Sequence, residues 1–433
     1  MKVLISTYAV CPPTYKTASH PGSEFIVAWN IISNLSRNKG LEITVLFGAT
    51  DVDFCSVENF ECIPSIRNLR FIRVKPSART RFIHRVFGWV RELWPLVLRS
   101  WLVDVRVIAA VLHAEHRFDV VHQLGPCGFK NPGRLYELNV PSVWGPIIGW
   151  HYYNLRLAYT QGFRLLIYAI GWNLANYVYS HDLNIKRAAN GYDRFIFGTP
   201  ETRDRFARRF GVSGVLLPEQ GIVSDVTSNA ISNERLNGSQ SYINRSEDAS
   251  LHVIWVGTIE FRKNLKLLLE VIRNLQSERF IFHIVGDGPQ SFDLFKEYKD
   301  VFEMPTVFQY KRLPRADLLS LMRRTDVIVF TTLAEGNTSV LFEALEGSIV
   351  PIGPNINGFS NTLGEGGGIL IDYNQSYRDI VEAYSIALKS LLKPEKYIDQ
   401  LCRTSLKKKR FLFDEITSTY YEIYQSAVRK HRD

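Results

Sequence analysis

Residues 326–353, DVIVFTTLAEGNTSVLFEALEGSIVPIG, contain a strand, a short polar loop, a helix and a second strand in direct succession. The run DVIVFT (326–331) is rich in β-branched and aromatic residues, which is typical of a buried strand. The run VLFEALEG (340–347) repeats apolar residues at helical spacing. A strand, a helix and another strand form the unit from which parallel, doubly wound sheets are built. This stretch therefore predicts an α/β fold.

The same alternation extends outward over most of the chain and predicts two Rossmann-like domains in tandem. The Ser- and Asn-rich segment 224–250 has little to bury and is interpreted as a polar loop between them. We expect a first domain over 1–217 and a second over 218–411, and the helical pattern at 412–433 can pack back on the first. The expected strands are 3–7, 43–48, 71–74, 120–124, 142–145 and 194–199 in the first domain, and 252–257, 280–286, 306–310, 326–331, 349–353 and 368–371 in the second.

Length and composition agree with this division. The chain has 433 residues, which is about twice the length at which one core stops growing, and 46% of them are hydrophobic, so a disordered chain is excluded. The net charge of +9 allows anionic partners. Five cysteines without a C-x-x-C pair favour reduced thiols in the cytoplasm, and we expect no signal peptide. The apolar run Gly162 to Tyr179 contains Arg164 and Asn173 and is interpreted as a buried helix.

Two carboxylates bracket the polar loop of the opening stretch. Glu335 precedes the loop, and Glu343 lies one turn into the helix that follows. The backbone N–H groups of Asn337, Thr338, Ser339 and Val340 are expected at the start of this helix, where unpaired donors and the helix dipole favour an anion such as a diphosphate. Glu335 could accept hydrogen bonds from sugar hydroxyls, and Glu343 could bind a ribose diol. The alternative is that Glu335 caps the helix and Glu343 is a solvated acid.

Two further turns follow expected strands of the second domain. Arg262 and Lys263 stand after WVG (255–257), at the edge of the sheet where such folds bind phosphate. Gly257, and Gly286 and Gly288 of IVGDGP (284–289), would let backbone approach a ligand closely. A solvated Arg-Lys pair is the alternative.

These elements, in this order and spacing, resemble the retaining glycosyltransferases of family 4, which adopt the two-domain GT-B fold. Glu335 and Glu343 match the family's pair of glutamates with seven residues between them, and Arg262-Lys263 matches its basic segment. The resemblance covers nearly the whole chain. In the first domain it includes HPGSEFIVAWN (20–30), with Gly22 and Ser23 in the Gly-rich loop, and VPSVWGPIIGW (140–150), which resembles members that assemble polysaccharides.

The resemblance implies a role for each residue. Lys263 and Arg262 would bind the diphosphate of a nucleotide sugar, Glu343 the ribose and Glu335 the donor sugar, while the loop at Gly22 and Ser23 would close over the phosphate or the acceptor. His122 is the best counterpart of the family's histidine near the reacting sugar, with a core histidine as the alternative.

Thr258 stands where family members often carry an arginine, so one phosphate contact could be missing or be supplied by Arg262. No metal or other cofactor is expected, because positioned cations and amides can stabilise a leaving diphosphate. Asp51-x-Asp53 resembles the metal-binding pair of a different glycosyltransferase fold, but it lies in the first domain, far from the phosphate elements.

The expected activity is that of a hexosyltransferase (EC 2.4). It would transfer sugar, with retention, to a hydroxyl of a glycan or lipid-linked saccharide in surface polysaccharide biosynthesis. A nucleotide-sugar-binding pseudoenzyme or assembly partner is the alternative. No nucleic-acid-binding motif is present, and no G-x-G-x-x-G follows the first strand to indicate a dehydrogenase.

The segment 78–106 interleaves arginines with aromatic residues, which suits peripheral contact with anionic lipid on the cytoplasmic face of the membrane, although its aromatics could instead pack a core. The interleaved residues are Arg79, Arg81, Phe82, Arg85, Phe87, Trp89, Arg91, Trp94, Arg99, Trp101 and Arg106.

Overall fold

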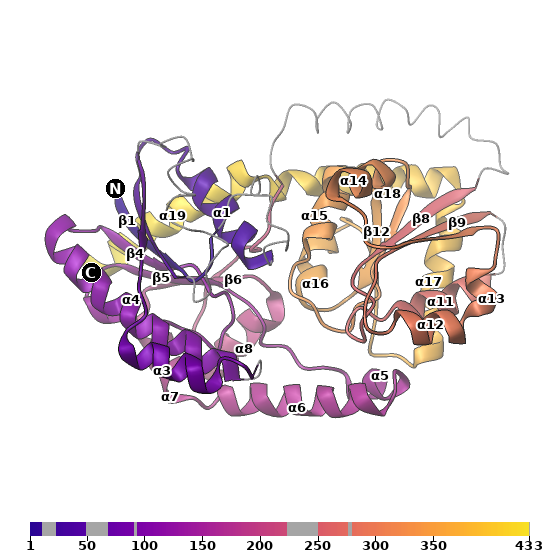
Figure 1. Cartoon of the computed structure of the whole chain (residues 1–433). Helices are drawn as coiled ribbons and strands as arrows, with labels where there is room; N and C mark the ends of the chain where they lie inside the picture. Colours follow the sequence, from indigo (N-terminus) through magenta and orange to yellow (C-terminus); the bar gives the residue numbers. More distant parts are fainter. Residues whose placement is uncertain (11–22, 49–67, 91–92, 223–249, 276–278, 433) are drawn as a thin grey trace. The chain divides into compact units, whose positions relative to one another are not determined.

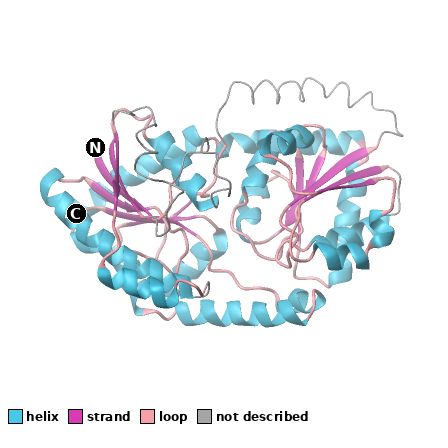
Figure 2. Ribbon diagram, in the orientation of Figure 1, coloured by secondary structure: helices cyan, strands magenta, loops and turns pink. Residues whose placement is uncertain are grey.

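The computed structural model describes residues 1–10, 23–48, 68–90, 93–222, 250–275 and 279–432. These residues form two compact units. Unit 1 comprises Met1–Trp150, Asn176–Gly221 and Phe413–Asp433, and unit 2 comprises His151–Ala175 and Ile222–Leu412. In each unit a central sheet carries helices on both faces, which is the α/β architecture that the sequence predicts (Figures 1 and 2).

Unit 1 contains a parallel sheet in the order β3-β2-β1-β4-β5-β6-β7. Its strands contain few polar residues because both faces are buried: Val3 and Ile5 contribute to one core cluster, and Leu4 to the cluster on the other face. The elements are β1 Lys2–Thr7, α1 Ser23–Leu35, β2 Glu42–Phe47, β3 Leu69–Arg73, α3 Ala78–Phe87, α4 Trp94–His116, β4 Val120–Gln123, η2 Leu135–Leu138, β5 Ser142–Ile147, α7 Leu183–Gly191, β6 Arg194–Phe197, α8 Pro200–Phe210, β7 Val215–Leu216 and α19 Phe413–Arg432.

Unit 2 contains a second parallel sheet, in the order β10-β9-β8-β11-β12-β13. This is the strand order of a Rossmann fold, 3-2-1-4-5-6. The elements are α5 Leu155–Thr160, β8 Leu251–Val256, α11 Leu265–Leu275, β9 Phe280–Val285, α12 Ser291–Glu297, α13 Lys299–Phe302, β10 Val307–Tyr310, α14 Arg315–Met322, β11 Val327–Val329, α15 Ser339–Glu346, β12 Val350–Pro354, α16 Asn357–Leu363, β13 Ile369–Ile371, α17 Tyr377–Leu391, α18 Pro394–Lys408 and η3 Lys409–Phe411.

The strand order creates one switch point in each sheet. The chain leaves β8 toward β9 on one side, and β11 lies on the other side of β8, with Val253 paired to Val327. In unit 1, β1 and β4 have the same relation, with Ile5 paired to His122. Ligands of doubly wound sheets bind at such switch points, beyond the carboxyl ends of the strands.

The segment 151–175 differs from the sequence-based expectations in two ways. It belongs to unit 2, although the predicted first domain ran to residue 217, because Leu157, Ala158, Leu165 and Ala169 pack into the core of unit 2. The helix α6 Phe163–Tyr179, which was expected to be buried, exposes many apolar side chains and crosses from one unit to the other at residue 175.

Candidate functional site

The candidate site in unit 2 lies at the switch point between β8 and β11. The loop after β8 carries Arg262 and Lys263, and the loop after β11 carries Glu335. Hydrogen bonds join the two loops: the backbone N–H of Leu333 donates to the carbonyl of Arg262 at 2.8 Å, and the hydroxyl of Thr331 donates to the carbonyl of Lys263 at 2.8 Å. These bonds fix the backbone from which both cations project.

The charged side chains of these loops contact one another. Lys263 Nζ lies 2.7 and 2.6 Å from the two carboxylate oxygens of Glu335, and Arg262 Nη1 lies 3.4 Å from the same carboxylate. Arg262 also donates to Glu260 at 2.7 Å. The side chains of Lys263 and Glu335 are only 15% and 14% exposed. The structure therefore brings together three residues that the sequence predicts as site residues, Arg262, Lys263 and Glu335.

Electrostatics within the cluster favour the charged form of Arg262. Partial burial on its own lowers the pKa of Arg262, but the carboxylates of Glu335 and Glu260 outweigh burial and raise this pKa. Glu260 was not predicted as a site residue. Its position two residues before Arg262, in the same turn, is the only signal that the sequence offered.

The helix α15 begins four residues after Glu335. Its N-cap residue, Thr338, makes no side-chain hydrogen bond to the first turn. Asn337 and Thr338 are buried, whereas Ser339 is exposed. Asn337 packs closely on α16, because a Cβ added at Gly358 would lie 2.2 Å from Asn337 Oδ1. A helix start without a side-chain cap, beside two cations, suits an anionic ligand.

Glu343 lies in the second turn of α15 with a side chain only 9% exposed, and it forms an ion pair of 2.7 Å with Arg315 Nη1. Arg315 is the first residue of α14 and is 67% exposed. Sequence reasoning did not find Arg315. Arg315 follows β10 closely, at the same edge of the sheet as the other loops. This position could have indicated Arg315 as a site residue.

The three predicted glycines of unit 2 mainly bring two loops together. A Cβ at Gly286 would lie 1.9 Å from the carbonyl oxygen of Gly257, and one at Gly288 would lie 2.5 Å from the carbonyl oxygen of Ile259. The N–H of Gly257 donates to Val285 at 3.0 Å. The glycines after β8 and β9 thus permit the close packing that supports the loop of Arg262 and Lys263.

We expect Gly286→Ala to destabilise the protein by more than about 2 kcal/mol, because the new methyl group would overlap backbone that cannot rotate away. Gly171→Ala is a matched control. A Cβ at this exposed position of α6 meets nothing within 4 Å, so alanine should stabilise the helix by about 0.5–1 kcal/mol. Calorimetry should show a midpoint lowered by several degrees for the first variant and not for the second. Equal midpoints would contradict the packing role.

In unit 1, His122 is fully buried in the core. Its ring nitrogens lie 2.8 Å from the Tyr424 hydroxyl of α19 and 2.7 Å from the Gly145 carbonyl. Burial lowers the pKa of His122 to about 4, and the Gly145 carbonyl opposes this only in part. This environment fits the alternative of a core histidine. Gly22 lies outside the described residues, and Ser23 is the first residue of α1.

The buried neutral His122 should make stability depend on pH. Between pH 6.5 and 4 the unfolded chain binds a proton at this residue and the folded chain does not. The contribution of the neutral ring to the free energy of unfolding is therefore complete above pH 6.5 and is lost as the pH falls toward 4. We expect wild type to lose roughly 2–3 kcal/mol more than His122→Gln over this interval in denaturant titrations. His283, whose pKa is also lowered to about 4, is present in both proteins and cancels. Parallel pH profiles would contradict the prediction.

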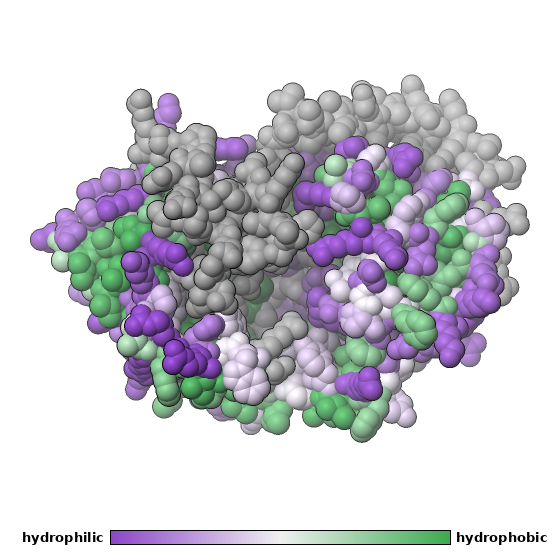
Figure 3. All heavy atoms as spheres, viewed as in Figure 1, coloured by the Kyte–Doolittle hydropathy of each residue, from purple (hydrophilic) through white to green (hydrophobic). Residues whose placement is uncertain are grey.

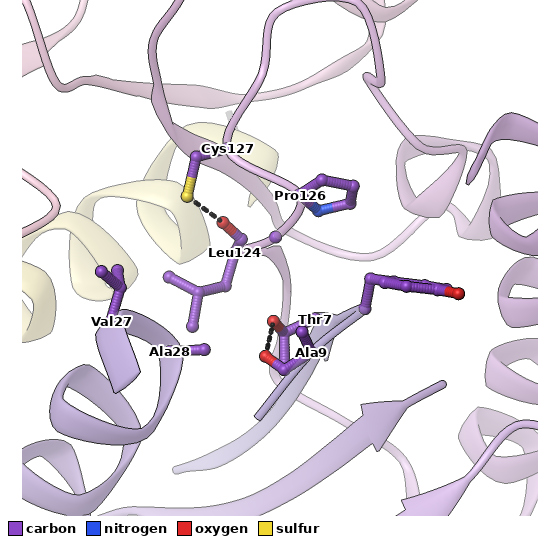
Figure 4. Close-up of a pocket in the computed structure, with 9 residues that line it drawn as sticks. Thr7, Ala9, Val27, Ala28, Leu124, Pro126 and Cys127 are labelled. Atoms are coloured by element: carbon purple, nitrogen blue, oxygen red, sulfur yellow. Dashed lines mark hydrogen bonds between the residues drawn. The ribbon is translucent and has the colours of Figure 1, made fainter. Parts of the chain in front are cut away.

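A pocket lies at the switch point of unit 1, beyond β1 and β4. It is small, with room for about one water molecule, and is partly open to solvent. Figure 4 shows Val27 and Ala28 of α1 facing Leu124 and Cys127, with the Cys127 thiol directed at the Leu124 carbonyl. The lining is mainly apolar and consists of Thr7, Tyr8, Ala9, Val27, Ala28, Leu124, Gly125, Pro126 and Cys127.

Asp51 and Asp53 lie outside the described residues. Among the residues that the structure describes, no group of three or more His, Cys, Asp or Glu side chains is arranged to hold a metal ion.

Comparison with protein families identifies the domain that carries this charged cluster. Residues 241–401 match the family model "Glycosyl transferases group 1". Over these residues the chain is similar to glycosyl transferases of group 1. This match confirms the predicted enzyme class, a glycosyltransferase. No curated protein sequence gives a significant match.

Several solved structures of similar fold align with nearly the whole chain. Sucrose-phosphate synthase from Thermosynechococcus elongatus aligns with a TM-score of 0.63 and 15% identity over 98% of both chains. WaaG, a glycosyltransferase involved in lipopolysaccharide biosynthesis, aligns with a TM-score of 0.56 and 15% identity over 97% of this chain and 99% of its own.

HepE of Anabaena, in complex with UDP and glucose, aligns with a TM-score of 0.53 and 14% identity over 98% of this chain and 100% of its own. At these identities the comparisons establish the fold. They confirm the predicted GT-B architecture of two Rossmann-like domains.

Proposed function

We propose that the chain is a retaining hexosyltransferase of family 4. It transfers a sugar from a nucleotide-diphosphate sugar to a hydroxyl of a glycan or lipid-linked saccharide, in surface polysaccharide biosynthesis. The observation that carries the proposal is the cluster of Arg262, Lys263 and Glu335 beside the start of α15. This cluster lies within the residues that match the group 1 model.

In the proposed mechanism, the donor's diphosphate displaces the Glu335 carboxylate from Lys263 and Arg262. Lys263 and Arg262 bind the diphosphate together with the first amides of α15, and Glu335 accepts hydrogen bonds from the sugar hydroxyls. As the bond between the anomeric carbon and the diphosphate oxygen breaks, these cations and amides stabilise the charge that develops on the leaving group. The acceptor oxygen bonds to the anomeric carbon on the same face, and its proton passes to the departing phosphate.

Glu343 binds the donor's ribose in this proposal. Its ion pair with Arg315 holds the carboxylate in place, and the exposed arginine can move aside when the nucleotide binds. Gly257, Gly286 and Gly288 keep the supporting loops together, and Asn337, Thr338, Ser339 and Val340 form the helix start. The chemistry requires no metal, because the two cations and the amides supply the positive charge.

A uridine nucleotide is the first donor to test, because a structural neighbour, HepE, was solved with UDP-glucose. In this proposal the acceptor binds beside the apolar pocket at the switch point of unit 1. His122 has a structural role in this proposal, because it contacts only core groups in the described part of the chain.

We expect Lys263→Ala to lower the affinity for UDP-sugar, and Glu335→Gln to lower its turnover, each roughly a hundredfold. Thermal shift with a panel of UDP-, GDP- and ADP-sugars measures donor binding, since a bound donor stabilises the folded state. Release of the nucleoside diphosphate measures turnover.

The pair Lys266 and Glu297 supplies the matched controls. Its 2.8 Å ion pair resembles that of Lys263 and Glu335 but joins α11 to α12. Lys266→Ala and Glu297→Gln should leave both measurements unchanged. If Lys263→Ala and Glu335→Gln behaved like these controls, the site assignment would be wrong. Donor binding by wild type without any turnover would favour the pseudoenzyme.

We further propose peripheral contact with the cytoplasmic face of the membrane through α3. In the described residues, no helix has the length and apolar character of a transmembrane span. The segment 78–106 forms two helices with different environments. Phe82 of α3 and Trp89, in the turn that follows this helix, are 65% and 81% exposed, and exposed arginines lie on α3, whereas Trp101 of α4 is buried in the core. Arg99 of α4 is paired with Asp182.

Replacing Phe82 and Trp89 with glutamine should reduce sedimentation with phosphatidylglycerol vesicles by about tenfold or more, because two exposed side chains would no longer enter the lipid interface. Increased salt should weaken the binding of wild type. Absence of wild-type binding at low salt would remove this part of the proposal.

A further inference from the structure

We propose that α5 and α6 of unit 2 form a second lipid-contact surface, which binds the interface of an anionic phospholipid membrane. This proposal deepens, and rests on, the proposed membrane location of the enzyme. The surface, called here the α5–α6 face, consists of the exposed side chains of Leu155, Tyr159, Phe163, Ile167, Ile170 and Leu174.

The α5–α6 face has a regular apolar period. Phe163, Ile167, Ile170 and Leu174 are spaced i, i+4, i+7 and i+11, so they lie on one side of α6. They are 71%, 55%, 47% and 61% exposed. Figure 3 shows hydrophobic atoms along the lower edge of the view, where α5 and α6 lie in Figure 1. Exposed apolar side chains that lie side by side mark an interaction surface.

The opposite side of α6 is firmly attached to unit 2. Leu165 and Ala169 are 2% and 0% exposed and belong to the core of this unit. The Asn173 side chain exchanges two hydrogen bonds with the backbone of Tyr153, at 2.8 and 3.0 Å, and Asn154 donates to the Tyr373 carbonyl at 3.1 Å. The helix is therefore apolar on two sides, of which unit 2 covers one.

The charges around this face favour an anionic surface as its occupant. From residue 151 to residue 181, the only Asp, Glu, Lys or Arg residues are Arg156 and Arg164, and both are exposed. Aromatic side chains of Tyr159, Phe163 and Tyr168 are also exposed. Arginines beside aromatic and aliphatic side chains are the composition of helices that lie in a lipid interface.

A second copy of the chain fits this face less well. Paired helices with an apolar seam usually gain specificity from salt bridges between flanking acids and bases. The segment 151–181 contains no Asp or Glu, so two copies of α6 would offer arginine without a carboxylate partner. An anionic bilayer supplies that negative charge. Contact there would hold unit 2 at the membrane, where a lipid-linked acceptor is found.

The main test replaces Ile167 and Leu174 with glutamine in the full chain and measures sedimentation with vesicles of phosphatidylcholine and phosphatidylglycerol. We expect a roughly tenfold or larger loss of binding. Ile386→Gln with Leu406→Gln is the matched control, because both residues are exposed, at 59% and 65%, on other helices of unit 2. This control should bind vesicles like wild type.

A charge test does not depend on the apolar substitutions. Arg156→Glu with Arg164→Glu should also reduce binding to phosphatidylglycerol vesicles, whereas Arg378→Glu with Lys396→Glu, at exposed positions elsewhere on unit 2, should reduce it less. Each variant is also measured in the background of Phe82→Gln and Trp89→Gln, which removes the contribution of α3.

Several results would overturn the proposal. The first is that the α5–α6 variants bind vesicles as strongly as the wild type does. The second is that the wild type binds vesicles of phosphatidylcholine alone as strongly as those that contain phosphatidylglycerol. The third is that the wild type is a dimer and that the substitutions at Ile167 and Leu174 dissociate it. Donor-induced thermal shift is measured in parallel. Loss of vesicle binding with a normal donor response supports the lipid surface, whereas a wild type without any donor response would contradict the proposed enzyme and leave the vesicle comparison intact.

Discussion

The ion pair between Lys263 and Glu335 connects the two strand-end loops on which the candidate site depends. Both side chains are about 15% exposed, so each ion has lost most of its hydration and needs the other. Burial of an ion pair contributes little net stability, but removal of one partner leaves a charge that is costly to keep. An anion that replaces Glu335 could neutralise Lys263, and the freed carboxylate would then need hydrogen-bond donors in place of the ammonium group.

Sheet topology explains why residues so far apart in sequence meet at this place. The loops after β8 and β11 start from adjacent strands, and their hydrogen bonds bring residue 263 to residue 335. Unit 1 repeats this arrangement at β1 and β4, where the described residues of the loops line a small pocket.

Most of the fold could be predicted from the sequence, because strands buried on both faces leave continuous apolar runs. Each predicted strand is present within about two residues at either end, and among the strands of the described residues the two-residue β7 alone was missed. The residues of the charged cluster could also be singled out, since Glu335 and the Arg262-Lys263 pair lie in the loops that follow two predicted strands. The ion pairs that join them depend on side-chain geometry, and Arg315 needed the strand order of the folded sheet to be linked with Glu343.

The environment of α6 could not be predicted, because an apolar helix gives the same pattern whether protein or another surface covers it. His122 was ambiguous for a related reason. A histidine at a strand end suits either a site or a core, and the contact with Tyr424 comes from a helix about 300 residues later.

The most direct test of the account is a crystal structure of the protein with a bound UDP-sugar. We predict diphosphate oxygens about 3 Å from Lys263 Nζ and from the first amides of α15, with the Glu335 carboxylate turned to the sugar hydroxyls. A diphosphate bound elsewhere, with Lys263 still holding both oxygens of Glu335, would contradict the central claim.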